Sequence, residues 1–285
     1  MKRLCVAIVI VFVITGMVFI AHFLRRYQTK DDIPPVISAE SDSIIMSVHA
    51  DGSELLNGMS AYDDKDGDVS DSLMVVSRSV FVGQDTVVIN YAAFDSHDNV
   101  GTYSQKVVFS DYVHPRFSLS APLIFSTINE TTNFLANVTC MDCLDGDITS
   151  RIKLISSDLS DTAISTNGKV DLFMQVTNSV GDTQTVSVSA IVQDKNENDK
   201  SCPAFSEYLW YVKRGEHLDI YGLVSGIRTS RGIVRLEDAG YTMDNIFVDD
   251  ALVRYDEPGT YVAAVTLHEM ENVIGTTDLY IVVED

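Results

Sequence analysis

The chain has 285 residues, a formal net charge of −21 at pH 7 and a hydrophobic content of 46%. This length allows two domains of average size or three small ones. Nucleic acids and anionic surfaces attract positively charged proteins, so the acidic charge excludes them as electrostatic partners.

The first feature along the chain is an apolar stretch at residues 4–24 with basic residues on both sides. A helix of this length, at about 1.5 Å per residue, measures about 31 Å and can cross a hydrocarbon core of about 30 Å. A cleaved signal peptide is the alternative, although its apolar core is shorter and ends in a small-x-small site that does not follow here. We predict a cytoplasmic stub at 1–3, a single transmembrane helix at 4–24 and a linker at 25–33.

After the linker, a five-residue motif occurs twice, as DGDVS from Asp66 and as DGDIT from Asp145. Pro35 and Pro115 precede the two copies by nearly the same distance, which indicates an internal repeat of roughly 80 residues. A third proline, Pro203, opens a P-x-F pattern like that of Pro115. We therefore predict three modules: module one at 34–112, module two at 113–196 and module three at 197–285.

Each module contains short runs of valine, isoleucine, threonine and aromatic residues, separated by glycine or aspartate. Residues 185–192 alternate polar and apolar side chains, as a strand with one buried face does. No long stretch beyond the apolar segment has a 3.6-residue apolar period, so we expect little helix. About seven strand candidates per module, at a spacing of about 8–12 residues, predict an all-β fold of three tandem β-sandwiches.

In module one the D-G-D motif is followed by a strand, then YAAFD ending at Asp95, then DNVG from Asp98 and a last valine-rich strand. This order resembles the bacterial immunoglobulin-like (Ig-like) modules of cell-surface proteins. Module two matches at its D-G-D motif and at Asn178–Gly181. Module three matches only at Pro258–Tyr261 and around residues 272–275. Because module three lacks the D-G-D motif, we interpret it as a divergent, capping copy.

The resemblance implies Ig-like sandwiches that serve as spacers, stalks or adhesive domains on exported proteins, and fold-level analogy does not name a ligand. We expect a membrane-anchored, single-pass cell-surface stalk or adhesion protein whose distal module three contacts a protein or glycan. One basic residue more follows the apolar segment than precedes it, which favours a cytoplasmic C-terminus. Long domains translocate largely regardless of such counts, so we place the C-terminal region outside the cell.

Two other functions remain open: an accessory subunit of a membrane-embedded secretion, wall-synthesis or pilus assembly, and a calcium-rigidified spacer. The chain has no G-x-S-x-G, H-E-x-x-H, Walker or G-x-G-x-x-G motif. We therefore expect no enzymatic activity and no cofactor, with calcium as the one exception to be considered.

Acidic residues crowd the turns of the repeat: Asp63, Asp64, Asp66 and Asp68 in module one, and Asp145 and Asp147 in module two. Carboxylates are the ligands that calcium prefers, which makes these six residues a candidate site. An EF-hand is excluded, because its sixth and twelfth positions counted from Asp64 hold Val69 and Val75. The alternative is a plain turn, in which aspartate binds the backbone, Gly67 takes a positive φ and Asp68 faces water.

Two further groups of residues are candidates for a functional role, one of cysteines and one of aromatic residues. Cys140 and Cys143 form a C-x-x-C pair without the βαβ context of a redox motif or the second pair of a zinc site. We predict a local disulfide between them, with two thiols as the alternative. At the start of module three, Tyr208, Trp210 and Tyr211 are a candidate aromatic platform for a partner, and packing within a core strand is the alternative.

Overall fold

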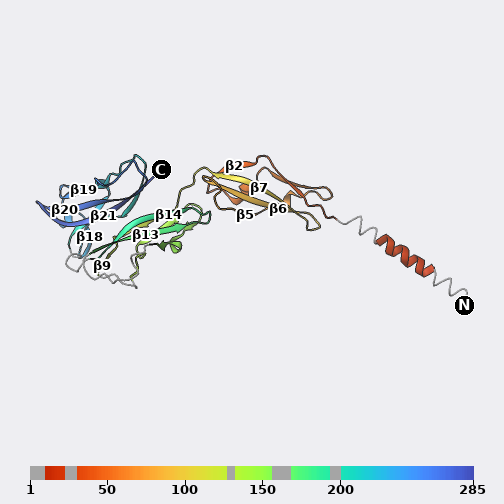
Figure 1. Ribbon diagram of the computed structural model, residues 1–285, viewed down its shortest axis with the longest axis horizontal. Coiled ribbons are helices and arrows are strands. Elements are labelled where there is room, and N and C mark those ends of the chain that lie inside the picture. The colour runs from red at the N-terminus through yellow and green to blue at the C-terminus, as the bar shows by residue number, and fades with distance from the viewer. Residues whose placement is uncertain (1–9, 23–30, 127–131, 156–167, 193–199) are drawn as a thin grey trace. The chain divides into compact units, whose positions relative to one another are not determined.

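The computed structural model describes residues 10–22, 31–126, 132–155, 168–192 and 200–285 (Figure 1). The chain divides into two compact units, Met1–Tyr112 and Val113–Asp285. Beyond the N-terminal segment the described residues are mainly antiparallel strands, which confirms the all-β sandwich class.

Residues 10–22 form a helix (Figure 1). The predicted span 4–24 extends at both ends into residues outside the described part, as do the predicted stub at 1–3 and most of the linker at 25–33. Among the described residues, no helix has both the length and the apolar character needed to cross a membrane.

Module one is a sandwich of two sheets. The first has the strand order β1-β3-β4, formed by Val36–Ala39, Met59–Asp63 and Gly67–Asp68. The second has the order β2-β7-β6-β5, formed by Ser43–Met46, Val100–Phe109, Thr86–Phe94 and Met74–Arg78. Two short 3-10 helices, η1 (Gly52–Leu56) and η2 (Ser70–Ser72), connect strands. The core lies between the sheets, where Val87, Ile89 and Tyr91 alternate with outward-facing residues along β6.

Module two has the same plan. Its first sheet has the order β11-β10-β8, formed by Gly146–Asp147, Val138–Asp142 and Arg116–Leu119. Its second has the order β12-β13-β14-β9, formed by Lys153–Leu154, Gly168–Thr177, Thr183–Val192 and Ile124–Phe125. The 3-10 helix η3 is Thr149–Arg151. The alternation predicted for residues 185–192 is confirmed, because Val186, Val188 and Ala190 are buried and point to one face.

Module three keeps this plan without a D-G-D motif. Its first sheet has the order β15-β17-β18, formed by Cys202–Phe205, Val224–Thr229 and Gly232–Val234. Its second has the order β16-β21-β20-β19, formed by Leu209–Lys213, Asn272–Glu284, Gly259–Glu269 and Ile246–Asp249. The short elements are α3 (Ile220–Leu223), η4 (Glu237–Ala239) and η5 (Met243–Asn245). In every module one edge strand pairs in parallel with the last long strand, as β2–β7, β9–β14 and β16–β21 do.

Modules two and three share one hydrophobic core, which differs from the expected string of separate sandwiches. A single cluster of buried side chains runs from Phe117 in β8 to Val283 in β21. Backbone and hydroxyl groups join the two modules directly: the Tyr208 amide donates to the Leu119 carbonyl (2.8 Å), and the Ser189 amide donates to the Tyr280 hydroxyl (2.8 Å). A sandwich of roughly 80 residues buries only a modest core of its own, so joining two enlarges the buried apolar surface of both.

Candidate functional site

Three carboxylates gather at one end of module one. Asp31 precedes β1, Asp63 is the last residue of β3, and Asp95 follows β6 directly. Their exposed fractions are 4%, 1% and 8%. One carboxylate oxygen of each residue lies within 4.8 Å of the other two. We call these three residues the acidic cluster.

The topology of module one explains why these residues meet. Strand β1 runs antiparallel to β3, so the chain that enters β1 lies beside the end of β3 where Asp63 sits. Gly101 near the start of β7 allows the entering chain to come close, because a Cβ there would lie 1.9 Å from the Pro35 carbonyl oxygen. The Asn99 side-chain amide donates to the Asp31 backbone carbonyl (3.1 Å), which joins the entering chain to the β6–β7 turn.

The hydrogen bonds of the acidic cluster are unevenly distributed over its oxygens. Asp63 Oδ1 accepts from the amides of Lys65 (2.9 Å) and Asp66 (3.0 Å). Asp31 Oδ1 accepts from the Ile33 amide (3.1 Å) and lies 3.4 Å from the Lys65 ammonium group. Among the residues that the structure describes, the buried atoms Asp31 Oδ2 and Asp63 Oδ2 have no hydrogen-bond partner. Two buried oxygens of ionisable groups are therefore left without a donor.

Asp95 is the best-satisfied member of the cluster. Its Oδ1 accepts from the amides of His97 and Asn99 (both 2.8 Å), and its Oδ2 accepts from the Asn99 side chain (2.6 Å). Burial raises the pKa of Asp95, but these donated hydrogen bonds outweigh burial and hold that pKa below its ordinary value. The carboxylate form of Asp95 is thus favoured.

Module two contains the matched site with one decisive difference. Asp142 occupies the place of Asp63, and its Oδ1 accepts from the amides of Leu144 (2.9 Å) and Asp145 (2.8 Å). Asn178 occupies the place of Asp95, and its side-chain nitrogen donates to Asp142 Oδ2 (3.0 Å). The oxygen that lacks a partner on Asp63 is therefore satisfied on Asp142.

Of the six aspartates predicted to bind calcium, only Asp63 belongs to the acidic cluster. Asp64 is exposed. Two of the other four bond within their own turn, as in the turn alternative: Asp68 accepts from Ser70 and Asp147 from Thr149. The remaining two reach a second turn: Asp66 accepts from Ser96, and Asp145 accepts from Ser179 as well as from Arg151. Gly67 and Gly146 take positive φ angles of 78° and 71°, as a turn glycine does.

The sequence reasoning missed Asp31 and Asp95. Asp95 ends the YAAFD stretch that carries the resemblance, and Asp31 stands four residues before Pro35, at the spacing that Asp111 has to Pro115. These positions were visible in the repeat, but their proximity to Asp63 depends on the pairing of β1 with β3.

Cys140 and Cys143 are not joined in a disulfide, which corrects the prediction. Cys140 lies within strand β10, is completely buried and points into the core of module two. Cys143 lies in the following turn, where its thiol donates to the Val113 carbonyl (3.1 Å). Because β10 ends at Asp142, Cys143 follows the turn towards Val113 while Cys140 stays in the core.

Cys140 is expected to resist alkylation while module two is folded. Burial, and then the negative charges of Asp142 and Asp147, raise the pKa of Cys140 to about 12. Its thiolate fraction at pH 8 is therefore very small, and thiolate is the reactive form. Mass spectrometry after iodoacetamide treatment should find Cys143 labelled and Cys140 unlabelled until denaturant is added. Early labelling of Cys140 would contradict its buried position.

The aromatic platform predicted at Tyr208, Trp210 and Tyr211 does not face solvent as a unit. Tyr208 has an exposed fraction of 2%, and the other two pack against the shared core. The Tyr211 hydroxyl accepts from the Phe117 amide (2.7 Å), and the Trp210 indole donates to the Glu207 carbonyl (2.9 Å). The packing alternative is the one that the structure supports, because β16 is the edge strand of its sheet in module three and contacts β8 of module two.

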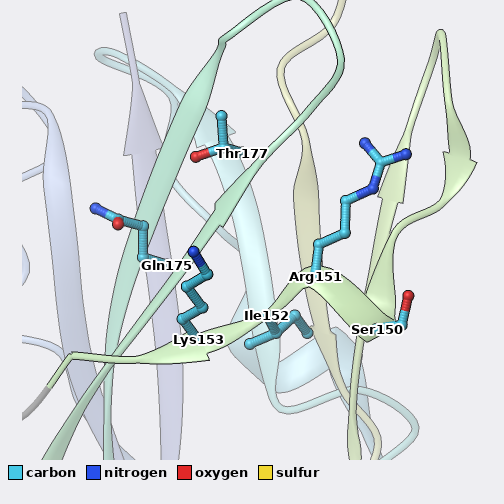
Figure 2. A pocket seen from close by; sticks show the side chains of 6 residues that line it. All are labelled: Ser150, Arg151, Ile152, Lys153, Gln175 and Thr177. Carbon is cyan, nitrogen blue, oxygen red and sulfur yellow. The ribbon is translucent and has the colours of Figure 1, made fainter.

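A surface cavity of about 320 Å³ opens beside β12 of module two, lined by Ser150, Arg151, Ile152, Lys153, Gln175 and Thr177. Figure 2 shows the Lys153 and Gln175 side chains on one side of it and Arg151 on the other. Arg151 is already paired with Asp145 (2.5 Å). Most of the lining side chains are exposed, and no buried polar atom of the cavity is left without a partner. Among the described residues, the acidic cluster is therefore the stronger candidate site.

No protein-family model and no curated protein matches the chain. Among solved structures it is similar to the CBM51-2 (with GlcNAc) and INT domains of Clostridium perfringens ZmpB, at 14% identity and a TM-score of 0.23, over 50% of this chain and 30% of that one. It is also similar to mouse cadherin-23 EC22-24, at 12% identity and a TM-score of 0.20, over 89% and 100%. At these values the alignments carry no inference about function, and the proposals below rest on the chain's own residues.

Proposed function

We propose that this chain is a non-catalytic, membrane-tethered protein of the cell surface that presents a binding face to a protein partner. The shared core of modules two and three is the observation that carries this proposal. Two domains joined only by a linker move relative to each other by default, whereas a large hydrophobic interface suppresses that motion. Residues 113–285 therefore provide a stiff carrier, as a stalk or adhesion protein requires.

The candidate binding face lies on the outer surface of the β19–β20–β21 sheet of module three. Phe247 of β19 contacts the His268 ring of β20 at a centroid distance of 4.4 Å, and Val273 of β21 pairs with His268. Phe247 and Val273 have exposed fractions of 50% and 55%, and Met270 at the tip of the hairpin reaches 92%. Large apolar side chains that stay exposed together mark an interaction surface.

The charges around this face indicate the chemistry of the partner. Glu269 and Glu271 flank Met270 and are exposed. A partner with an apolar pocket could receive Phe247, Val273 and Met270, and lysine or arginine at the rim of that pocket would pair with Glu269 and Glu271. We therefore favour a protein partner over a glycan.

The double variant Phe247→Ser/Val273→Thr tests the binding face. Cells that display the full chain should attach to partner-bearing surfaces at least about tenfold more weakly with this variant, because central interface residues carry most of the binding energy. Ile233→Ser is the matched control, since Ile233 is 58% exposed but lies in the other sheet of module three. Equal attachment by the double variant and the control would overturn the assignment of this face.

Protease added to intact cells tests the proposed orientation. If residues beyond the N-terminal segment are outside, external protease should remove them while a cytoplasmic marker stays intact. Protection of residues 113–285 in intact cells, or crosslinking only to proteins of the same membrane, would favour the accessory-subunit alternative instead.

A further inference from the structure

We propose that Asp31, Asp63 and Asp95 bind one calcium ion at the end of module one. The proposal goes beyond the surface role above and is independent of it, because module one takes no part in the proposed binding face. It rests on two separate observations: the convergence of the three carboxylates, and the two buried oxygens among them that lack a hydrogen-bond donor.

The charge of the acidic cluster requires a counter-charge. Three carboxylates and the Lys65 ammonium group sum to two negative charges in a site where the carboxylates are more than nine-tenths buried. Buried charges without a partner are costly, and like charges at this separation repel each other. A divalent cation between Asp31 Oδ2 and Asp63 Oδ2 would neutralise the charge and give both oxygens a partner.

The ligand set favours calcium. The cluster contains only oxygen donors, which suit hard cations and not zinc or copper. Magnesium demands near-ideal octahedral geometry and gives up its bound water reluctantly, whereas calcium accepts an irregular set of carboxylate oxygens. Water would complete the coordination shell.

Module two shows how the same turn is satisfied without an ion. There the Asn178 side-chain amide donates directly to Asp142 Oδ2, so an amide and not a carboxylate stands at the position of Asp95. The aligned residue of module one is Asp95, which has no such donor to offer Asp63. In module two an amide satisfies the buried aspartate, whereas in module one a third carboxylate occupies that position. Only the site in module one therefore needs a cation.

Binding at this site would have a mechanical consequence. Asp31 belongs to the segment that enters module one, whereas Asp63 ends strand β3 and Asp95 follows strand β6 of the sandwich itself. An ion held by all three would therefore tie the entering segment to the body of the module, in addition to the Asn99 hydrogen bond.

Calorimetric titration of the EDTA-treated full-length chain with calcium chloride tests the proposal. We expect one ion per chain, weaker binding of magnesium, and a rise of about 10 °C in the melting temperature of module one at saturation. Asp31→Asn and Asp95→Asn should each lose this binding. Asp68→Asn is the control, because Asp68 lies in β4, the strand that pairs with the end of β3, and its carboxylate accepts from Ser70 outside the acidic cluster.

The melting temperature of the Asp95→Asn variant gives a second readout besides the titration. Because this variant removes one calcium ligand, calcium chloride should raise its melting temperature far less than it raises that of the wild type. Absence of calcium binding, binding that survives Asp95→Asn, or equal binding of magnesium would each overturn the proposal. One calcium site, together with a calcium-induced rise in melting temperature that Asp95→Asn loses, would support it.

Discussion

Replacing Leu172 by alanine is expected to lower the melting temperature of module three as well as that of module two. Leu172 is completely buried in β13 of module two. A leucine-to-alanine change in a core costs about 2–5 kcal/mol, which corresponds to about 10 °C in a unit of this size. Because the two modules share one core, the loss should be felt by both.

The single tryptophan of the chain makes this coupling measurable. Trp210 lies in β16 of module three, so its fluorescence reports the unfolding of that module. In the Leu172→Ala variant the fluorescence transition should shift together with the calorimetric transition of residues 113–285. Phe173→Ala is the control, because Phe173 is the next residue along the strand and is 44% exposed. A fluorescence transition that stays in place would show that module three folds independently of module two.

Removal of residues 197–285 should unfold module two while module one stays folded. The deletion uncovers the face of module two that now packs against module three, and it removes the hydrogen bonds to Leu119, Phe117 and Ser189. Loss of a contact surface of this kind exceeds what a module of roughly 80 residues can tolerate, since its own core is modest. Circular dichroism should then show the β-signal of one sandwich only.

A longer deletion serves as the control for this experiment. A chain that ends at residue 112 retains the whole of the first compact unit and should melt as module one does in the full chain. If the chain that ends at residue 196 showed two intact sandwiches by limited proteolysis, the shared core would not be needed for the stability of module two.

Periodicity and spacing account for most of the fold. The two D-G-D motifs and the three prolines stand at matched distances because each module repeats one strand order with one turn at the same place. The alternation at residues 185–192 followed directly from the pleat of a strand that has one buried face. Even module three, which lacks the motif, keeps the parallel pairing of β16 with β21.

The functional residues were less accessible to such reasoning. Asp64, Asp66 and Asp68 attracted attention because they crowd one turn. Asp68, however, accepts a short-range hydrogen bond from Ser70, which is a usual role of such residues, and Asp66 accepts from Ser96 in the β6–β7 turn. The residues that converge come instead from three places, Asp31, Asp63 and Asp95, separated by about thirty positions each. Sequence neighbours on a strand or turn diverge, whereas partners across a sheet converge, so a dense run of acidic residues is a poor guide to a metal site.

What the amino-acid order determined alone was local and repetitive: strands, turns with positive-φ glycines, and three copies of one topology. Only the tertiary structure decided that modules two and three share a core and that Asp63 meets Asp31 and Asp95. The physical reason is that hydrophobic patterning indicates which face of a strand is buried. Burial is non-directional, so the pattern does not indicate which other strand or module covers that face.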